Sequence, residues 1–181
     1  SSAKEVNVSG TYAGGSTTRI KRTVSGEGSF NYKSSVTVVA TPKTGHSFVG
    51  WFDDKDNLVS DEATYTFEMP ANNLSFVAKF KVNKYTLTVT SESEEKGSVT
   101  GGGEFEYNEL VTIKVTVNEG YKFNGWYLGD WDMSYDEEYT FNMPDRSINY
   151  VARFINNRYN ISVNYDFNKG QVEGETDYKV K

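Results

Sequence analysis

The chain has 181 residues, of which 36% are hydrophobic and 24% are charged, as in an ordinary globular protein. It contains no cysteine, which excludes disulfide bonds, thiolate nucleophiles and cysteine metal sites. The net charge of −6 argues against a sequence-independent grip on nucleic-acid phosphate. No run approaches the roughly 18 apolar residues that a membrane helix needs. We therefore expect neither nucleic-acid binding nor membrane insertion in this segment.

One stretch of the sequence occurs twice. The seven residues Gly45 to Trp51 (GHSFVGW) return 75 positions later as Gly120 to Trp126 (GYKFNGW). A fixed period of this length indicates tandem structural repeats, each of which gains stability from its neighbour. The sequence thus predicts a first module at residues 1–82, a second at residues 83–156, and the opening hairpin of a third at residues 157–181.

Each repeat opens with apolar and polar residues in alternation. This pattern covers residues 4–8 in the first copy and 85–90 in the second, and it starts again at Tyr159. Alternation is the period of a strand with one buried face. We interpret residues 4–24 as a hairpin with a loose turn, and expect the third copy to restart the same hairpin as far as Val172.

Further strands follow in the same order in both copies. The signals, given as first and second copy, are an aliphatic strand at 36–40 and 111–115, the aromatic motif, an acidic loop at 53–62 and 129–138, a Tyr-Thr-Phe-x-Met-Pro strand at 65–70 and 139–144, and a last strand at 74–80 and 148–154. High aromatic content, 15%, suits small all-β cores. We expect a mostly β chain of two small antiparallel modules, either β-grasp-like or sandwich-like.

The aromatic motif supplies the predicted structural core. Each tryptophan has the opposite strand parity from the phenylalanine three residues before it, which would expose the tryptophan to a ligand unless the intervening glycine forms a bulge or both faces are buried. We favour core, because a large aromatic kept in both copies anchors a small module. The predicted core residues are Phe48, Gly50, Trp51, Phe123, Gly125 and Trp126.

The polar residues change between the copies, which argues against a shared catalytic site. His46 is the only histidine, so neither a histidine triad nor a two-histidine metal site can form within one chain. It becomes Tyr121 in the second copy, which favours a ring at a strand start over a catalytic or pH-sensing group. We predict no catalytic residue, no metal ligand and no cofactor, and hence a protein that is not an enzyme.

The acidic loops are where function is expected, because there the copies differ. Asp53 to Asn57 and Asp130 to Asp132 resemble pieces of a calcium loop but lack the ligand spacing and terminal Glu of an EF-hand, so we interpret them as solvated turns. Trp131 and Tyr135 are the candidate ligand contacts, because an indole between carboxylates can stack on a sugar ring. Alternatively, Trp131 caps the junction between modules.

The sequence resembles the divergent internalin-type B-repeat family, also called the Listeria/Bacteroides repeat group, of bacterial surface proteins. The motifs that carry the resemblance are Tyr-Thr-Leu-Thr-Val at 85–89, Val-Thr-Ile-x-Val at 111–115, Gly-Tyr-x-Phe-x-Gly-Trp at 120–126, Phe-x-Met-Pro at 141–144 and Val-Ala-Arg-Phe at 151–154. The first copy departs in its Thr/Gly-rich opening and in His46.

This resemblance implies a tandem β module in a bacterial cell-surface, cell-wall or secreted protein. The implied role is a non-catalytic stalk, spacer or adhesive segment, with neighbouring repeats, a host or cell-wall protein, or a glycan as partners. The alternative is a carbohydrate-binding accessory module of a secreted glycan-degrading enzyme, with Trp131 and Tyr135 as its stacking surface.

Overall fold

The computed structural model describes residues 3–12, 24–160 and 177–179. The chain divides into two compact units, residues 1–84 and 85–181, and each is described by itself. Within the described ranges every regular element is a β-strand. No helix suited to crossing a membrane occurs in this part of the chain.

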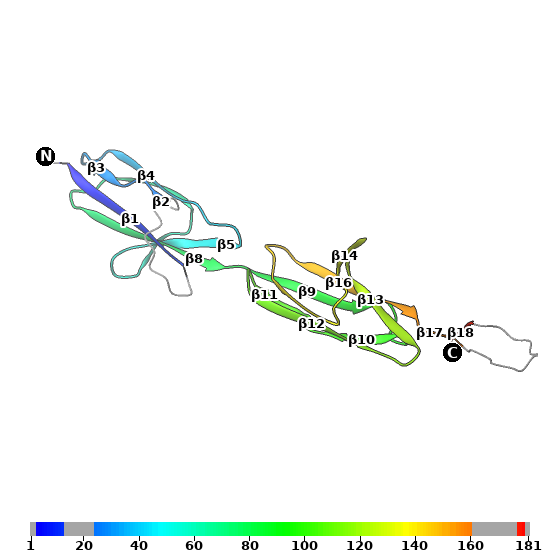
Figure 1. Ribbon diagram of the computed structural model, residues 1–181. Coiled ribbons are helices and arrows are strands. Elements are labelled where there is room, and N and C mark those ends of the chain that lie inside the picture. The colour runs from blue at the N-terminus through cyan, green and yellow to red at the C-terminus, as the bar shows by residue number, and fades with distance from the viewer. Residues whose placement is uncertain (1–2, 13–23, 161–176, 180–181) are drawn as a thin grey trace, which may run out of the picture. The chain divides into compact units, whose positions relative to one another are not determined.

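The first unit contains two sheets (Figure 1). One sheet has five strands in the order β3-β1-β8-β5-β6, and the other has three in the order β2-β4-β7. The strands are β1 (Lys4–Tyr12), β2 (Val24–Ser25), β3 (Gly28–Phe30), β4 (Ser35–Ala40), β5 (His46–Phe52), β6 (Leu58–Ser60), β7 (Thr64–Glu68) and β8 (Leu74–Val82).

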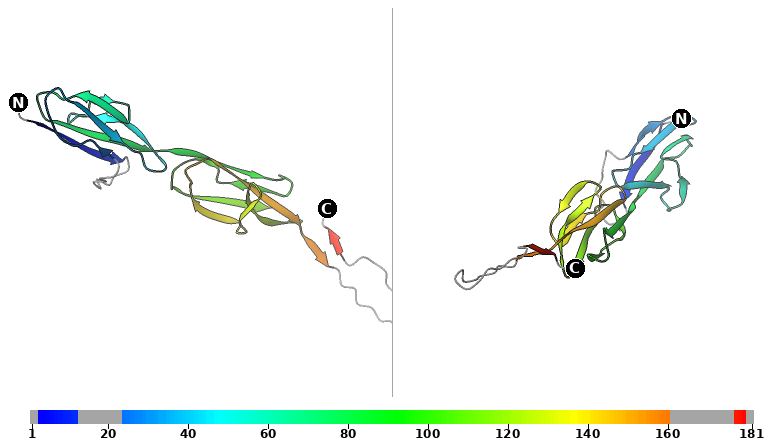
Figure 2. Two further views of the ribbon diagram at one scale, coloured as in Figure 1. Left: turned by 90° about the horizontal axis from the view of Figure 1, so that it is seen from above. Right: turned by 90° about the vertical axis from the view of Figure 1, so that its right-hand side faces the viewer.

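The second unit repeats this arrangement strand by strand. Its sheets have the orders β11-β9-β16-β13-β14 and β10-β12-β15. The strands are β9 (Lys84–Ser91), β10 (Gly97–Thr100), β11 (Gly103–Glu106), β12 (Leu110–Val117), β13 (Tyr121–Leu128), β14 (Trp131–Ser134), β15 (Glu138–Asn142) and β16 (Ile148–Asn156). Figure 2 shows the layers of each unit from two other directions.

The core of each unit lies between its two sheets. In the first unit it combines Val6 of β1 and Trp51 of β5 with Val38 of β4, which belongs to the opposite sheet. The second unit uses the equivalent strands, with Leu87, Trp126 and Ile113. Because both sheets contribute buried side chains and the described residues include no helix, the sandwich-like alternative describes the modules.

The first predicted hairpin is wrong in its pairing. β1 pairs with β3 and β8, whereas β2 pairs with β4 in the other sheet. Alternation identifies a strand and its buried face but not the neighbouring strand, and here the two arms of the expected hairpin enclose the core from opposite sides. Residues 13–23, which contain the expected turn, lie outside the described residues.

One pair in each unit is parallel. β1 runs alongside β8 in the same direction, and β9 does the same with β16. The other described pairs of the two units are antiparallel. The strands that begin and end each repeat therefore form the middle of its larger sheet.

The region of the expected third repeat is described at its two ends. β17 (Arg158–Asn160) pairs antiparallel with β18 (Asp177–Lys179). The positions expected to form the rest of its strands, up to Val172, lie outside the described residues.

Candidate functional site

The second glycine of each aromatic motif, which both copies share, lies at a β-bulge. The register between β5 and β8 shifts between Phe48 and Gly50, and the register between β13 and β16 shifts between Phe123 and Gly125. The extra residue reverses the parity of the strand, so the phenylalanine and the tryptophan end on the same face. The bulge explanation for the parity of the motif is confirmed.

The motif tryptophans lie in the interior of their units. Trp51 and Trp126 are each 0% exposed, and their rings meet those of Phe48 and Phe123 edge to face, with centroids 5.8 Å and 5.4 Å apart. The two phenylalanines are half-buried. The tryptophan rings therefore offer no face to a ligand, which leaves the loops after the motif as the place for a contact site.

The motif strand of the second unit and the strand after it build a hairpin that stands out from the unit (Figure 1). β13 and β14 pair across Gly129 and Asp130, with Leu128 opposite Trp131. Gly129 takes a positive φ of 62°, which a two-residue hairpin turn favours. Its carbonyl oxygen accepts a hydrogen bond from Nη2 of Arg153 at 3.1 Å. The turn is thereby tied to the body of the sheet.

Three apolar residues in or next to β14 are exposed. Trp131, Met133 and Tyr135 are 77%, 40% and 65% exposed, and we call them the exposed apolar residues. The register between β13 and β14 shifts at Met133, so these side chains do not follow one face of the strand by simple alternation. β14 is the outermost strand of its sheet. The sequence interpretation named Trp131 and Tyr135 and did not name Met133.

Tyr135 is held in place by two neighbours. Its hydroxyl donates a hydrogen bond to the carboxylate of Asp132, which raises the pKa of Tyr135 to about 12. Its ring lies over Gly125, where a Cβ atom would come within 3.1 Å of the tyrosine Cδ1 atom. The bulge glycine therefore also leaves room for a candidate contact residue.

Acidic residues are frequent in the sequence next to the exposed apolar residues. They are Asp130, Asp132, Asp136, Glu137 and Glu138. Of these five, only Glu138 has an ion pair with a described residue, to Lys114 at 2.9 Å. The surface around the exposed indole is consequently acidic, in keeping with the 6 basic and 13 acidic residues of positions 83–156.

The equivalent loop of the first unit is a compact turn. Asp53 accepts hydrogen bonds from the backbone N–H groups of Lys55 (2.9 Å) and Asn57 (2.8 Å) and from the Asn57 amide (3.0 Å). The side-chain bond from Asn57 is the largest cause that lowers the pKa of Asp53. Asp56 forms an ion pair with Lys79. Two carboxylates of the calcium-like segment are therefore engaged within the protein.

His46 and its counterpart act as loop contacts. Nδ1 of His46 lies 2.9 Å from the carbonyl oxygen of Thr44, and the Tyr121 hydroxyl donates to Oε1 of Glu95 at 3.1 Å. Both rings begin the motif strand of their unit. Among the described residues, no cluster of three His, Asp or Glu side chains has a geometry suited to a metal ion.

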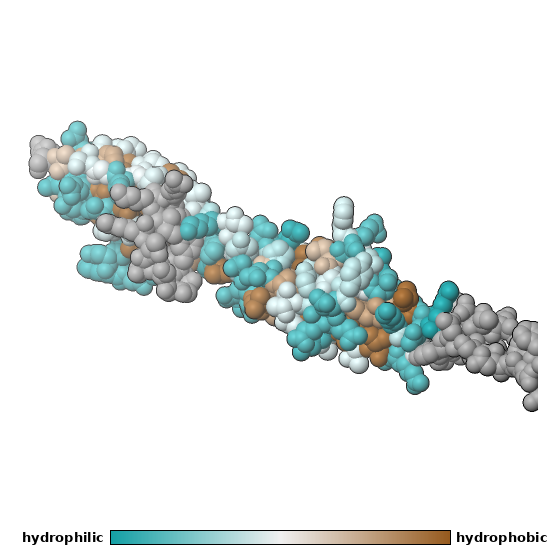
Figure 3. Space-filling view, viewed as in Figure 1, coloured by the Kyte–Doolittle hydropathy of each residue, from teal (hydrophilic) through white to brown (hydrophobic). Residues whose placement is uncertain are grey.

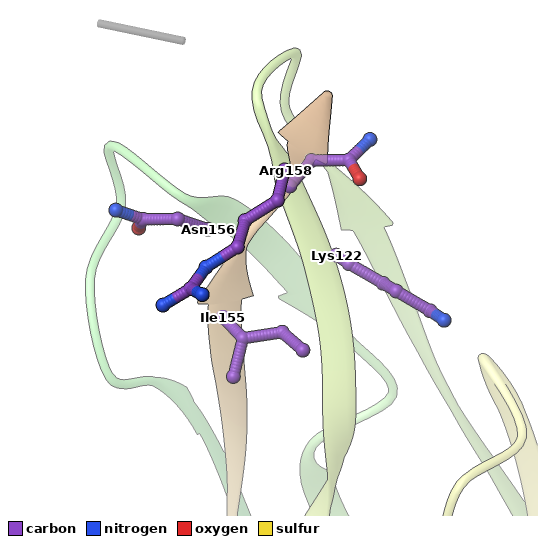
Figure 4. A pocket seen from close by; sticks show the side chains of 5 residues that line it. Lys122, Ile155, Asn156 and Arg158 are labelled. Atoms are coloured by element: carbon purple, nitrogen blue, oxygen red, sulfur yellow. The ribbon is translucent and has the colours of Figure 1, made fainter. Parts of the chain in front are cut away.

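A separate hollow of about 550 Å³ lies at the end of β16, lined by Lys122, Ile155, Asn156, Asn157 and Arg158. Figure 4 shows that the Lys122 and Arg158 side chains diverge from one another, with Ile155 between them. Cationic groups that diverge do not define one binding point. On the face shown in Figure 3, hydrophobic residues form small separate patches among hydrophilic ones. The exposed apolar residues of the β13–β14 hairpin remain the candidate contact residues.

Two tandem β units with the same sheet order, bulge and buried tryptophan define a repeat module of the kind found in arrays. A family model described as the divergent InlB B-repeat domain matches residues 16–84 and again residues 85–158. The chain belongs to this family, a family of repeat domains in bacterial surface proteins. The resemblance drawn from the sequence motifs is thereby confirmed.

Relatives of the chain include much longer proteins. The chain is 30% identical over 142 residues to a protein of Evansella cellulosilytica that is named as a membrane protein, covering 75% of this chain and 20% of that one. It is 31% identical over 124 residues to internalin H of Listeria monocytogenes, covering 65% and 21%. The chain thus spans about a fifth of the length of these relatives.

Among solved structures, the Bacillus anthracis TIE protein aligns with 87% of this chain and 35% of its own. The TM-score is 0.47 and the sequence identity is 12%.

Proposed function

We propose that this chain is a non-catalytic stalk or spacer segment of a bacterial cell-surface or secreted protein, with an adhesive contact on its second repeat. Its family membership and its likeness to internalin H and to a protein named as a membrane protein support an extracellular or cell-wall location. The two units have equivalent core residues and different loops, as is typical of a repeated structural module.

The observation that carries the spacer role is the direction of the first and last strands. The chain enters the first unit at the start of β1 and leaves it at the end of β8, and these points lie at opposite ends of a parallel pair. The same holds for β9 and β16 in the second unit. Each added repeat therefore advances the chain by about one strand length instead of returning it to its starting side.

Small-angle scattering tests the spacer role. Inserting one further copy of residues 85–158 should lengthen the maximum dimension by about 30 Å, the span of a nine-residue strand at roughly 3.3 Å per residue. If the added copy increases the radius of gyration only as much as expected for a compact globular protein of the same length, the proposal is contradicted.

The absence of catalysis is proposed from the comparison of the two copies. His46 is replaced by Tyr121, and the acidic loops differ in both sequence and hydrogen bonding. A catalytic set would need the same polar residues wherever the activity is repeated. We further propose that residues 157–181 begin a third repeat, since β17 pairs with β18 as β9 neighbours β11.

The adhesive contact is assigned to Trp131 and Tyr135. Trp131 is 77% exposed on the outermost strand of its sheet, and Tyr135 is fixed by Asp132. Exposed aromatic side chains of this kind can stack on a glycan or fill a pocket of a host or cell-wall protein. The alternative, a carbohydrate-binding accessory module, depends on the same exposed indole.

Binding assays on the whole chain decide between these partners. Glycan-array or cell-wall binding should be lost in Trp131→Ala and kept in Leu58→Ala, a matched control that removes a 58% exposed apolar side chain from the first unit. If the Trp131→Ala variant still binds, the adhesive contact does not lie on this surface. Binding to soluble glycans, with none to cell-surface protein, would favour the carbohydrate module.

A further inference from the structure

The first and last strands of each unit form a long parallel ladder. In the first unit the partners run from Val6 opposite Leu74 to Tyr12 opposite Phe80. In the second unit they run from Leu87 opposite Ile148 to Ser91 opposite Ala152. Both ladders lie in the middle of the five-stranded sheet, with a further strand on each side.

The direction of these strands decides how tension would act on a unit. Tension pulls the start of the first strand one way and the end of the last strand the other way. In a parallel pair these points lie at opposite ends, so the two strands are driven to slide along each other. The evenly spaced hydrogen bonds of a parallel ladder then share the tension and must break together. Pulling across the ladder would break them one after another.

A side chain fastens the incoming end of the ladder in both units. The Asn73 amide oxygen accepts a hydrogen bond from the backbone N–H of Glu5 at 3.0 Å. The Ser147 hydroxyl accepts one from the backbone N–H of Thr86, also at 3.0 Å. Each acceptor directly precedes the last strand, and each donor directly precedes the first paired residue. The bond is kept although the side chain changes.

The outgoing end of the last strand is bonded to the motif strand on its other side. The backbone N–H of Asn83 donates to the carbonyl oxygen of Gly45 at 2.9 Å, and that of Asn157 donates to the carbonyl oxygen of Gly120 at 2.8 Å. The asparagines follow β8 and β16, and the glycines precede β5 and β13. These bonds hold the end of the last strand in the sheet, whereas the parallel ladder itself is fastened at its incoming end.

The second unit has an additional bond pair at the end of its shorter ladder. The backbone N–H of Glu92 donates to the carbonyl oxygen of Ala152 at 3.0 Å, and the Glu92 carboxylate accepts from the backbone N–H of Phe154 at 3.1 Å. These contacts continue the connection between β9 and β16 past the last paired residues. They partly offset its smaller number of pairs.

We propose that each repeat is a mechanical clamp, in which the parallel pair of first and last strands resists tension applied along the chain. This inference rests on the proposed spacer role, which supplies the tension. It adds that the resistance of the sheet to force depends on direction. The resistance is high when the force acts along the chain and low when it acts across the same two strands. The rate of forced unfolding is set by the barrier to opening this ladder.

Single-molecule force spectroscopy on the full chain tests the clamp. Because the chain has no cysteine, two introduced cysteines define the points of attachment. Lys84→Cys with Asn156→Cys pulls the second unit along the ladder. Thr88→Cys with Asn149→Cys, exposed partners in register, pulls across it. Both pairs act on the same fold.

The same design applies to the first unit. Ala3→Cys with Lys81→Cys pulls along β1 and β8, and Asn7→Cys with Ser75→Cys pulls across them. If one of the four variants fails to fold in a thermal melt, the other unit still provides a complete comparison.

The expected result is a rupture force severalfold higher along the ladder than across it at the same pulling speed. Equal forces in the two directions would overturn the clamp. Scattering measures the extension of the chain without applied force. A chain that is extended but has equal rupture forces in both directions would therefore support the spacer role and contradict the clamp.

Discussion

Nε1 of Trp126 donates a hydrogen bond to the carbonyl oxygen of Asp136 at 3.0 Å, whereas Nε1 of the equivalent Trp51 has no partner among the residues that the structure describes. Both indoles are fully buried at the same position of the motif. The two repeats therefore share a core side chain but differ in how its polar atom is satisfied.

This difference predicts unequal costs for one substitution. Phenylalanine at either position leaves a similar void, but Trp126→Phe also removes the indole donor of the Asp136 carbonyl, whereas Trp51→Phe removes an unpaired donor. We expect Trp126→Phe to be more destabilising by about 1–2 kcal/mol. Hydrogen exchange on the full chain, resolved by unit, measures both free energies of unfolding. Equal costs, or a larger one at Trp51, would contradict this account.

Two equivalent glycines should be intolerant of any side chain. Gly26 and Gly101 have φ angles of 108° and 106°, and a Cβ atom would lie 2.8 Å from Cα of Val38 or 2.9 Å from Cα of Ile113. We expect alanine at either position to cost more than the roughly 1–2 kcal/mol of left-handed strain. Gly129→Ala is the control, since its φ is 62° and nothing lies within 4 Å. Urea denaturation should rank Gly129→Ala as the mildest of the three.

The Tyr135–Asp132 hydrogen bond predicts a late tyrosine titration. The pKa of Tyr135 is raised from 10.0 to about 12, so the hydrogen bond contributes its full stability below pH 10.0 and loses it as the pH rises through about 12. Asp132→Asn should return this titration toward the ordinary value in tyrosinate absorbance. Tyr150, raised to about 12 mainly by burial, should stay late and serves as the internal control.

The bond at the incoming end of each ladder predicts a mechanical effect larger than its equilibrium effect. Ser147→Ala removes the acceptor for the Thr86 N–H, which lies at the surface. The free energy of unfolding should fall by about 1 kcal/mol or less, while the rupture force along the ladder should drop clearly. Ser98→Ala, an exposed change on β10 outside the ladder, is the control. If Ser98→Ala lowers the rupture force as much, the bond between Thr86 and Ser147 has no specific mechanical role.

Exposure separates the two tryptophans of the second repeat. Trp131→Ala removes a side chain that is 77% exposed and should change stability by no more than about 0.5 kcal/mol. Trp126→Ala empties the core and should cost about 3–5 kcal/mol. Thermal melts of the full chain compare them. Strong destabilisation by Trp131→Ala would mean that the indole supports the fold.

The sequence alone determined the repeat, the family and the positions of most strands. It was wrong for β6 and β14, which it placed in the acidic loops at 53–62 and 129–138, because these short edge strands show no clear alternation. These follow from local patterns: alternation over a few residues, glycines and prolines at turns, and one motif written twice. Comparing His46 with Tyr121 was enough to direct attention to the loops. Trp131 was singled out as a candidate because it breaks the pattern that the two copies share, and Tyr135 because it is a neighbour of Trp131 in the sequence.

Only the tertiary structure decided which strands are neighbours. Alternation in residues 4–8 is equally compatible with a hairpin partner nearby and with β8, some 70 positions away. Closing the longer loop costs only a little more, because that cost grows with the logarithm of its length. β1 pairs with β8 because this arrangement lets the two sheets bury one core between them. The bulge serves the same purpose, because it places Trp51 on the same face of the strand as Phe48. The parallel ladder, and the clamp inferred from it, arise from that choice.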